Sequence, residues 1–176
     1  EKRVCGRFRQ NRSRSTAHTT SPTMPHEDLT AYRSPVNDAL DRPIPDTGEL
    51  RVFLDDDTES DNRIAPDGWI HLITAREVCF LLDSGRVIEL SLDNDLSNDR
   101  LYGTGSQVID YLEHQQGAHG RFLWPRDGIV LHTANSGRRD QMTAAIERCA
   151  ERGFVKLTSG WQGGKPRFLL ERPDDA

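Results

Sequence analysis

Apolar residues in this chain fall into short runs that alternate with segments of helical periodicity. The runs are rich in Val, Ile and Leu and have the length of strands, whereas the longer segments place apolar residues three and four apart, as an amphipathic helix does. The predicted strands are 50–54, 69–72, 87–92 and 128–132. The predicted helices run from Thr74 to Gly85, from about Ser106 to Gln116, and from Ser136 to Gly153.

The order of these elements predicts the fold class. Strands that alternate with helices are typical of a parallel sheet with crossover helices. Two further segments, Phe154–Thr158 and Arg167–Glu171, are joined by a glycine-rich turn and predict a hairpin at the C-terminal end. We therefore predict an α/β fold, a flavodoxin-like doubly wound parallel sheet with strand order 2-1-3-4-5 and a C-terminal β-hairpin.

The segment before the first strand has a different composition. Residues 1–48 are rich in Ser, Thr, Arg and Pro and show no periodicity, so we predict a flexible tail ahead of a domain at 49–171 and a short tail at 172–176. Residues 1–23 hold six Lys or Arg and one acid, whereas the whole chain has a net charge of −5. The basic segment could touch nucleic acid or could be a solvated extension upstream of a start at Met24.

Several classes of protein are disfavoured by composition. The three cysteines show neither a disulfide framework nor metal-ligand spacing. No stretch approaches 18 apolar residues, so we expect no membrane span. The basic N-terminal residues lack the apolar core of a secretory signal. The expected location is therefore the reducing cytoplasm.

Polar clusters follow three of the predicted strands. Asp55–Asp57 follows the first, Asp93–Asp95 follows the run at 87–92, and His132–Asn135 ends the run at 128–132. Because the carboxyl ends of parallel strands meet at one edge of a sheet, we expect these clusters to share a site.

The acidic clusters predict a metal site. Adjacent carboxylates repel one another unless a cation neutralises them, and hard oxygen ligands suit Mg²⁺ or Mn²⁺. Asp55, Asp56 and Asp57 are therefore candidate metal ligands, and Asp93, with Asp95 directed the same way, would lie nearest Asp55 and Asp56 if the two strands are neighbours. The alternatives are a solvated acidic loop for Asp55–Asp57 and a cap of the following turn by Asp95 or Asn94, which for Asn94 is the preferred interpretation.

The third cluster predicts an acid–base and anion-binding group. His132 could act as a general acid or base, and Thr133 could donate to a phosphoryl oxygen. Asn135 or Ser136 could cap the following helix, whose first turn carries Arg138 and Arg139 beside free N–H groups. The structural alternatives are a buried structural histidine, a plain helix cap and surface arginines.

Residues from about 51 to 152 resemble the cyclic-phosphate processing receiver domain, a divergent branch of the response-regulator receiver superfamily. The matching stretches are Phe53–Asp56, Ala65–Trp69, Ser91–Leu96, Gly105 ahead of a helix, and Val130–Asn135. The resemblance implies a receiver-like fold and the processing of cyclic phosphates on RNA ends or nucleotides, in RNA repair or defence. It also implies Mg²⁺ ligation by Asp55, Asp56 and Asp93, with a pocket completed by Asp95, His132, Thr133 and Asn135.

The chain departs from that family pattern in three respects. Asn94 stands where the branch commonly has His, Asp57 adds a charge, and no receiver-type Lys is securely placed. Two other functions therefore stay open beside a metal-dependent phosphoesterase. One is a signalling receiver phosphorylated on Asp93, and the other is a non-catalytic nucleic-acid or protein adaptor that uses the basic tail.

Overall fold

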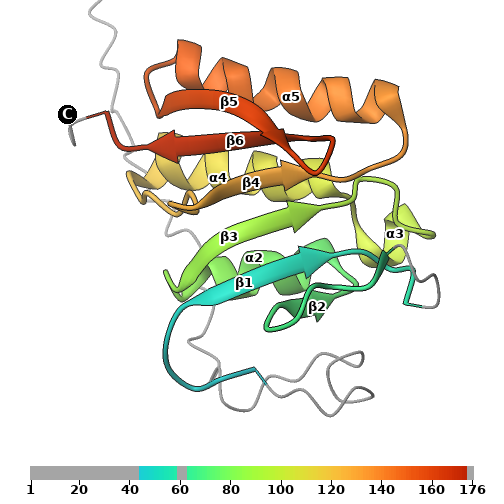
Figure 1. Cartoon of the computed structure of the whole chain (residues 1–176). Coiled ribbons are helices and arrows are strands. Elements are labelled where there is room, and N and C mark those ends of the chain that lie inside the picture. The colour runs from blue at the N-terminus through green and yellow to red at the C-terminus, as the bar shows by residue number, and fades with distance from the viewer. Residues whose placement is uncertain (1–43, 59–62, 174–176) are drawn as a thin grey trace, which may run out of the picture.

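A computed structural model of the chain describes residues 44–58 and 63–173, which form a sheet with helices on one side (Figure 1). The strands are β1 (Leu50–Leu54), β2 (Ile70–Leu72), β3 (Val87–Leu92), β4 (Gly128–Leu131), β5 (Lys156–Gln162) and β6 (Lys165–Glu171). The helices are α2 (Ala75–Asp83), α3 (Asp99–Tyr102), α4 (Gly105–His119) and α5 (Ser136–Glu151). Residues 1–43 of the predicted tail lie outside the described residues. Among the helices described, none is both long and apolar enough to cross a membrane.

The sheet confirms the predicted α/β class and the first four places of the predicted order. β2, β1, β3 and β4 lie in that order and run parallel. The place beside β4 is taken by β6, which is antiparallel to it, and β5 is the outer strand, so the full order is β2-β1-β3-β4-β6-β5. The sheet is therefore mixed, because a hairpin supplies its last two strands.

The hairpin reverses at Gly163 and Gly164. Both residues have positive φ, 57° and 76°, as a two-residue type I′ turn between antiparallel strands requires. Gly160 lies inside β5 opposite Arg167, so the turn is shorter than the glycine-rich stretch between the two predicted strands. The turn lies at the end of β6 that is nearest the carboxyl end of β4, because β4 and β6 run in opposite directions.

The strand register sorts side chains onto two sides of the sheet. Val52, Leu90, Ile129 and Phe168 are aligned across β1, β3, β4 and β6, and each is at most 2% exposed. They belong to one apolar core with residues of α2, α4 and α5, such as Leu112. The three helices pack next to one another, α2 against α4 and α4 against α5, behind the strands in Figure 1.

The start of α4 is held against the end of β3. Thr104 caps the helix and forms a capping box with Gln107. Gly105 follows the cap, and a Cβ atom at that position would lie 2.3 Å from the main-chain oxygen of Asp93. The helix therefore approaches the loop after β3 more closely than any residue other than glycine allows.

Candidate functional site

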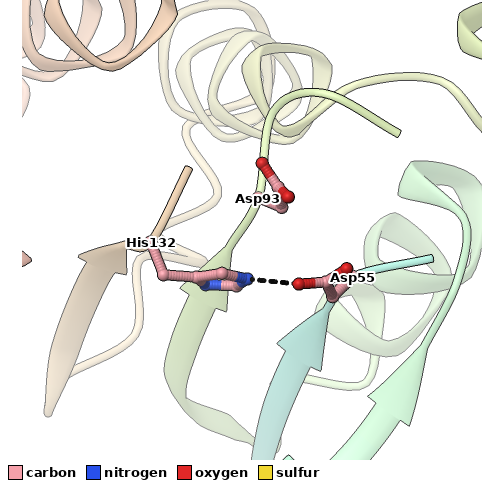
Figure 2. A group of neighbouring side chains, drawn as sticks. All are labelled: Asp55, Asp93 and His132. Atoms are coloured by element: carbon pink, nitrogen blue, oxygen red, sulfur yellow. Dashed lines mark hydrogen bonds and ion pairs between the residues drawn. The ribbon is translucent and has the colours of Figure 1, made fainter. Parts of the chain in front are cut away.

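Three predicted site residues come together at the carboxyl edge of the sheet. Asp55, Asp93 and His132 follow β1, β3 and β4, and one ligand atom from each lies within 4.8 Å of the other two (Figure 2). Phe53 and Ser91 are aligned across β1 and β3, and Asp55 and Asp93 each lie two residues further along, on the same side. The period of the strands thus brings these side chains together, as the sequence predicted.

His132 is fixed by contacts on both of its ring nitrogens and on its face. Its Nε2 lies 3.2 Å from Oδ2 of Asp55, and its Nδ1 lies 2.8 Å from Oγ of Ser91. The ring stacks on Phe53 with centroids 4.4 Å apart and an interplanar angle of 10°. The side chain is only 3% exposed, so packing and hydrogen bonds hold one orientation of the imidazole.

Asp55 is fully buried and bonded through both side chain and main chain. Its Oδ1 accepts from the backbone N–H of Asp57 at 2.9 Å, and its main-chain carbonyl accepts from Nε2 of His71 at 2.6 Å. Burial alone would raise the pKa of the Asp55 carboxyl. The hydrogen bonds from His132 and Asp57 and the electrostatic attraction of His132 and Arg63 outweigh that effect, so the pKa lies below its usual value.

The side chain of Arg63 also lies in this site, and the sequence analysis did not predict it. Its Nη1 donates to Oδ2 of Asp93 at 2.7 Å and to Oδ1 of Asp55 at 3.4 Å. Partial burial lowers the pKa of Arg63, but the charges of Asp55 and Asp93 more than reverse this, so the guanidinium stays charged. The available signal was composition, because Arg63 is the single Lys or Arg between residues 52 and 75, a stretch crowded with acids.

Hydrogen bonds of the Asp93 and Asn94 side chains hold the loop after β3. Oδ1 of Asp93 accepts from the backbone N–H of Asp95 at 3.1 Å. Oδ1 of Asn94 accepts from the backbone N–H and the hydroxyl of Ser106, in the first turn of α4, at 3.0 and 2.6 Å. Asn94 is therefore a buried anchor for α4 and not a cap for the turn that follows it. Asp95 is exposed, with its Oδ1 3.9 Å from Nε of Arg138.

Asp56, which the sequence analysis placed among the metal ligands, bonds to the loop after β3. Its Oδ2 accepts from the backbone N–H of Ser97 at 2.6 Å and also from the Ser97 hydroxyl. Asp56 is not one of the three residues whose ligand atoms lie within 4.8 Å of one another. Asp56 instead borders an open cleft of about 480 Å³ beside the site, lined by Asp56, Asp57, Thr58, Arg63, Asp95 and Ser97.

The residues that follow β4 begin α5. Thr133 is buried and its Oγ1 accepts from the backbone N–H of Asn135. Asn135 is the N-cap of α5, with its Oδ1 3.2 Å from the backbone N of Arg138. Nη1 of Arg139 donates to the main-chain oxygen of Thr133 at 3.5 Å. Of the two predicted caps, Asn135 is the one observed, and both arginines lie on the first turn of the helix.

The arrangement has the chemistry of a cation site. The carboxylates of Asp55 and Asp93 lie close together and are 0% and 1% exposed. Burying such charges without a partner of opposite sign would cost on the order of several kcal/mol per charge. Carboxylate oxygens together with an imidazole nitrogen can bind a divalent metal ion. The cluster of Asp55, Asp93 and His132 could therefore hold a metal ion.

Comparison with known protein families identifies the domain. A family model described as the cyclic-phosphate processing receiver domain matches residues 50–148, more than half of the 176-residue chain. No curated protein and no solved structure matches this chain. The matched residues include Asp55, Asp93 and His132, whereas β5 and β6 lie outside them. The family name links the domain to cyclic phosphates, and the chain belongs to this family, the cyclic-phosphate processing receiver domains.

Proposed function

We propose that this domain binds a divalent metal ion, Mg²⁺ or Mn²⁺, on Asp55 and Asp93 and processes a cyclic phosphate carried by an RNA end or a nucleotide. The single observation that supports this most is the convergence of two buried carboxylates and His132 within 4.8 Å at the carboxyl edge of the sheet. In an open α/β sheet this edge is where ligands bind.

The negative charge of the two carboxylates supports the binding of a metal ion at the site. Asp55 and Asp93 are buried next to each other, and the guanidinium of Arg63 lies against both. A bound ion would offset the charge of the substrate phosphate and of the pentacoordinate transition state. The oxygens of Asp55 and Asp93 would hold it, each steadied by a backbone N–H, from Asp57 and Asp95 respectively.

His132 is proposed as the proton carrier. Its Nε2 faces the carboxylates, and Ser91 holds its Nδ1 at 2.8 Å. A hydroxyl can either donate or accept, so Ser91 can partner the imidazole in both tautomers. His132 could therefore give a proton to the leaving oxygen of a cyclic phosphate, or take one from the attacking water.

The first turn of α5 is proposed to hold the substrate. Arg138 and Arg139 lie next to the N-cap Asn135, where free N–H groups and the helix dipole attract anions. Asp95, 3.9 Å from Arg138, would keep that guanidinium turned toward the cleft. Thr133, buried below them, would fix the turn that presents Asn135 and could donate to a phosphoryl oxygen.

The test is turnover of defined substrates. We expect wild-type protein with Mg²⁺ or Mn²⁺ to open the 2′,3′-cyclic phosphate of a short RNA or of a mononucleotide, and Asp93→Asn to reduce that rate by at least ~100-fold, since it removes a metal ligand. Asp110→Asn, an equally conservative change at an exposed position of α4, is the control. No turnover by wild type, or equal turnover by Asp93→Asn, would refute the proposal.

The signalling alternative is separated by a different measurement. Asp93 would then accept a phosphoryl group, so acetyl phosphate should label the wild-type protein and not Asp93→Asn. Its carboxylate is 1% exposed and both oxygens already accept hydrogen bonds, from Asp95 and Arg63. Labelling that is lost in Asp93→Asn would favour the signalling function, whereas turnover of a cyclic phosphate without labelling would favour the metal-dependent reaction.

A further inference from the structure

Arg63 places a positive charge against the buried carboxylate pair. Its Nη1 is 2.7 Å from Oδ2 of Asp93 and 3.4 Å from Oδ1 of Asp55, and its Nε is 3.9 Å from Oδ2 of Asp57. The Arg63 side chain is 32% exposed, whereas the side chains of Asp55 and Asp93 are 0% and 1% exposed. The guanidinium thus reaches the carboxylates from the solvent side of the site.

A metal ion and this guanidinium need the same oxygens. Mg²⁺ binds oxygen at about 2.0–2.1 Å, and Nη1 of Arg63 already lies within hydrogen-bond distance of Asp93 Oδ2. An ion bridging Asp55 and Asp93 would occupy the space of Nη1, and two positive charges at such a distance repel strongly. Binding of the ion and the present contacts of Arg63 therefore exclude each other.

We propose that Arg63 is the counter-ion of the metal-free site and becomes a phosphate-binding residue once a divalent ion replaces it on Asp55 and Asp93. This inference rests on the metal site of the proposed function. It assigns to Arg63 two roles that follow one another, first neutralising the two carboxylates and then receiving the substrate.

The cleft beside the site supports the second role. Among the described residues that line it, the other charged ones are Asp56, Asp57 and Asp95, and Arg63 is the single basic one. A phosphate that enters therefore meets these carboxylates and a guanidinium that belongs to the cleft lining. The planar fork of Arg63 can give two parallel N–H bonds to a phosphate, whereas a lysine ammonium acts as a point charge.

The experiment measures metal binding first. Mn²⁺ titration by calorimetry compares wild type with Arg63→Ala and Arg63→Lys. The control is Arg126→Ala, which removes the same charge at the opposite edge of the sheet, where Arg126 pairs with Glu49. We expect Arg63→Ala to bind Mn²⁺ on the order of tenfold more tightly than wild type, Arg63→Lys to lie between them, and Arg126→Ala to match wild type. Thermal unfolding gives a second readout, because Mn²⁺ should raise the Tm of Arg63→Ala more than that of wild type.

The second measurement is phosphate binding at saturating Mg²⁺. There we expect Arg63→Ala to bind inorganic phosphate about tenfold more weakly and Arg63→Lys to be intermediate. The two effects of Arg63→Ala thus have opposite signs, which a purely structural role would not produce. Equal or weaker Mn²⁺ binding by Arg63→Ala would overturn the inference while leaving the metal site intact. Absence of Mn²⁺ binding in every variant would overturn both proposals, and Mn²⁺ binding without turnover would reject the proposed reaction alone.

Discussion

The two sides of the central strands carry different kinds of side chain, although successive residues of each strand face the two sides in turn. The helix side consists of aligned apolar residues such as Val52, Leu90 and Ile129, all fully buried. The opposite side carries Phe53 and Ser91 in the next aligned row and continues into the three site residues. We call these the core side and the site side of the sheet.

The comparison shows how one sheet separates stability from chemistry. On the core side, contacts are apolar and shared among three helices, so each side chain contributes mainly by filling space. On the site side, contacts are directional and paired, such as Ser91 with His132 and Arg63 with Asp93. Substitutions on the core side should therefore change unfolding, whereas those on the site side should change binding and proton transfer.

The largest expected effect is on the core side. Leu92 is fully buried at the end of β3, and Leu92→Ala should lower the free energy of unfolding by about 2–5 kcal/mol through lost burial and a cavity. Urea unfolding measures this. Leu101→Ala is the matched control, because Leu101 in α3 is 71% exposed. A loss no greater than that of the control would mean that the core is not closed at this position.

Gly105→Ala should affect both sides at once. The added methyl would lie 2.3 Å from the main-chain oxygen of Asp93 and 2.9 Å from Cε of Met142. We expect a loss of about 1–3 kcal/mol in unfolding free energy, as for other overpacked sites, and weaker Mn²⁺ binding because Asp93 must shift.

The matched control for this substitution is Gly137→Ala in α5. A Cβ there meets only Oδ1 of Asn135, at an ordinary 3.6 Å, so higher helix propensity should make the change neutral or stabilising by up to about 1 kcal/mol. Similar behaviour of the two variants would show that α4 can move away from β3 without disturbing the site.

Much of the fold followed from local patterns, and the exception has a tertiary cause. The runs at 50–54 and 87–92 and the helical spacing after Thr74 predicted β1, β3 and α2 in their observed places. The position of β6 beside β4 was not predicted. Strand neighbours depend on a turn that reverses the chain and on a free sheet edge, and neither is encoded in the apolar pattern of Lys165–Glu171.

The candidate site was predictable where it depended on strand ends and not where it depended on loops. Asp55, Asp93 and His132 followed from the shared edge of parallel strands. Arg63 was not predicted, because a loop side chain reaches the site through the tertiary fold and has no periodicity to reveal it. Ser91 was not predicted as a partner of His132, because a polar residue inside a buried strand gives no sign of what it contacts.

Lowering the pH should have an intermediate effect on the free energy of unfolding. The contacts of Asp55 hold its pKa in the folded protein below the usual 3.8. A carboxyl with a lowered folded pKa stabilises the fold above its unfolded pKa, and this contribution is lost as the pH falls through the folded value. In urea unfolding between pH 2 and pH 7, the stability difference between wild type and Asp55→Asn should be constant above about pH 5 and shrink below the unfolded pKa. A difference that grows on acidification would contradict the assigned direction.

The smallest expected effect on stability comes from Ser91→Ala, which removes one hydrogen bond on the site side. Ser91 is aligned with Phe53 in β1 and its Oγ lies 2.8 Å from Nδ1 of His132. The loss in unfolding free energy should be about 0.5–1.5 kcal/mol, well below that of Leu92→Ala. If His132 carries the proton, however, kcat should fall about tenfold with KM unchanged, and the pH profile should move, since the Nδ1 of the imidazole loses its hydrogen-bond partner.

Ser91→Thr and Thr158→Ala sharpen this last test. Ser91→Thr keeps the hydroxyl and should retain most of kcat, whereas Thr158→Ala, on the exposed outer strand β5, should change neither kcat nor the pH profile. A Ser91→Ala variant that is less stable but has the wild-type pH profile would assign Ser91 to packing alone. The site side would then differ from the core side only at its carboxyl edge, because residues within the strands would contribute to folding on both sides.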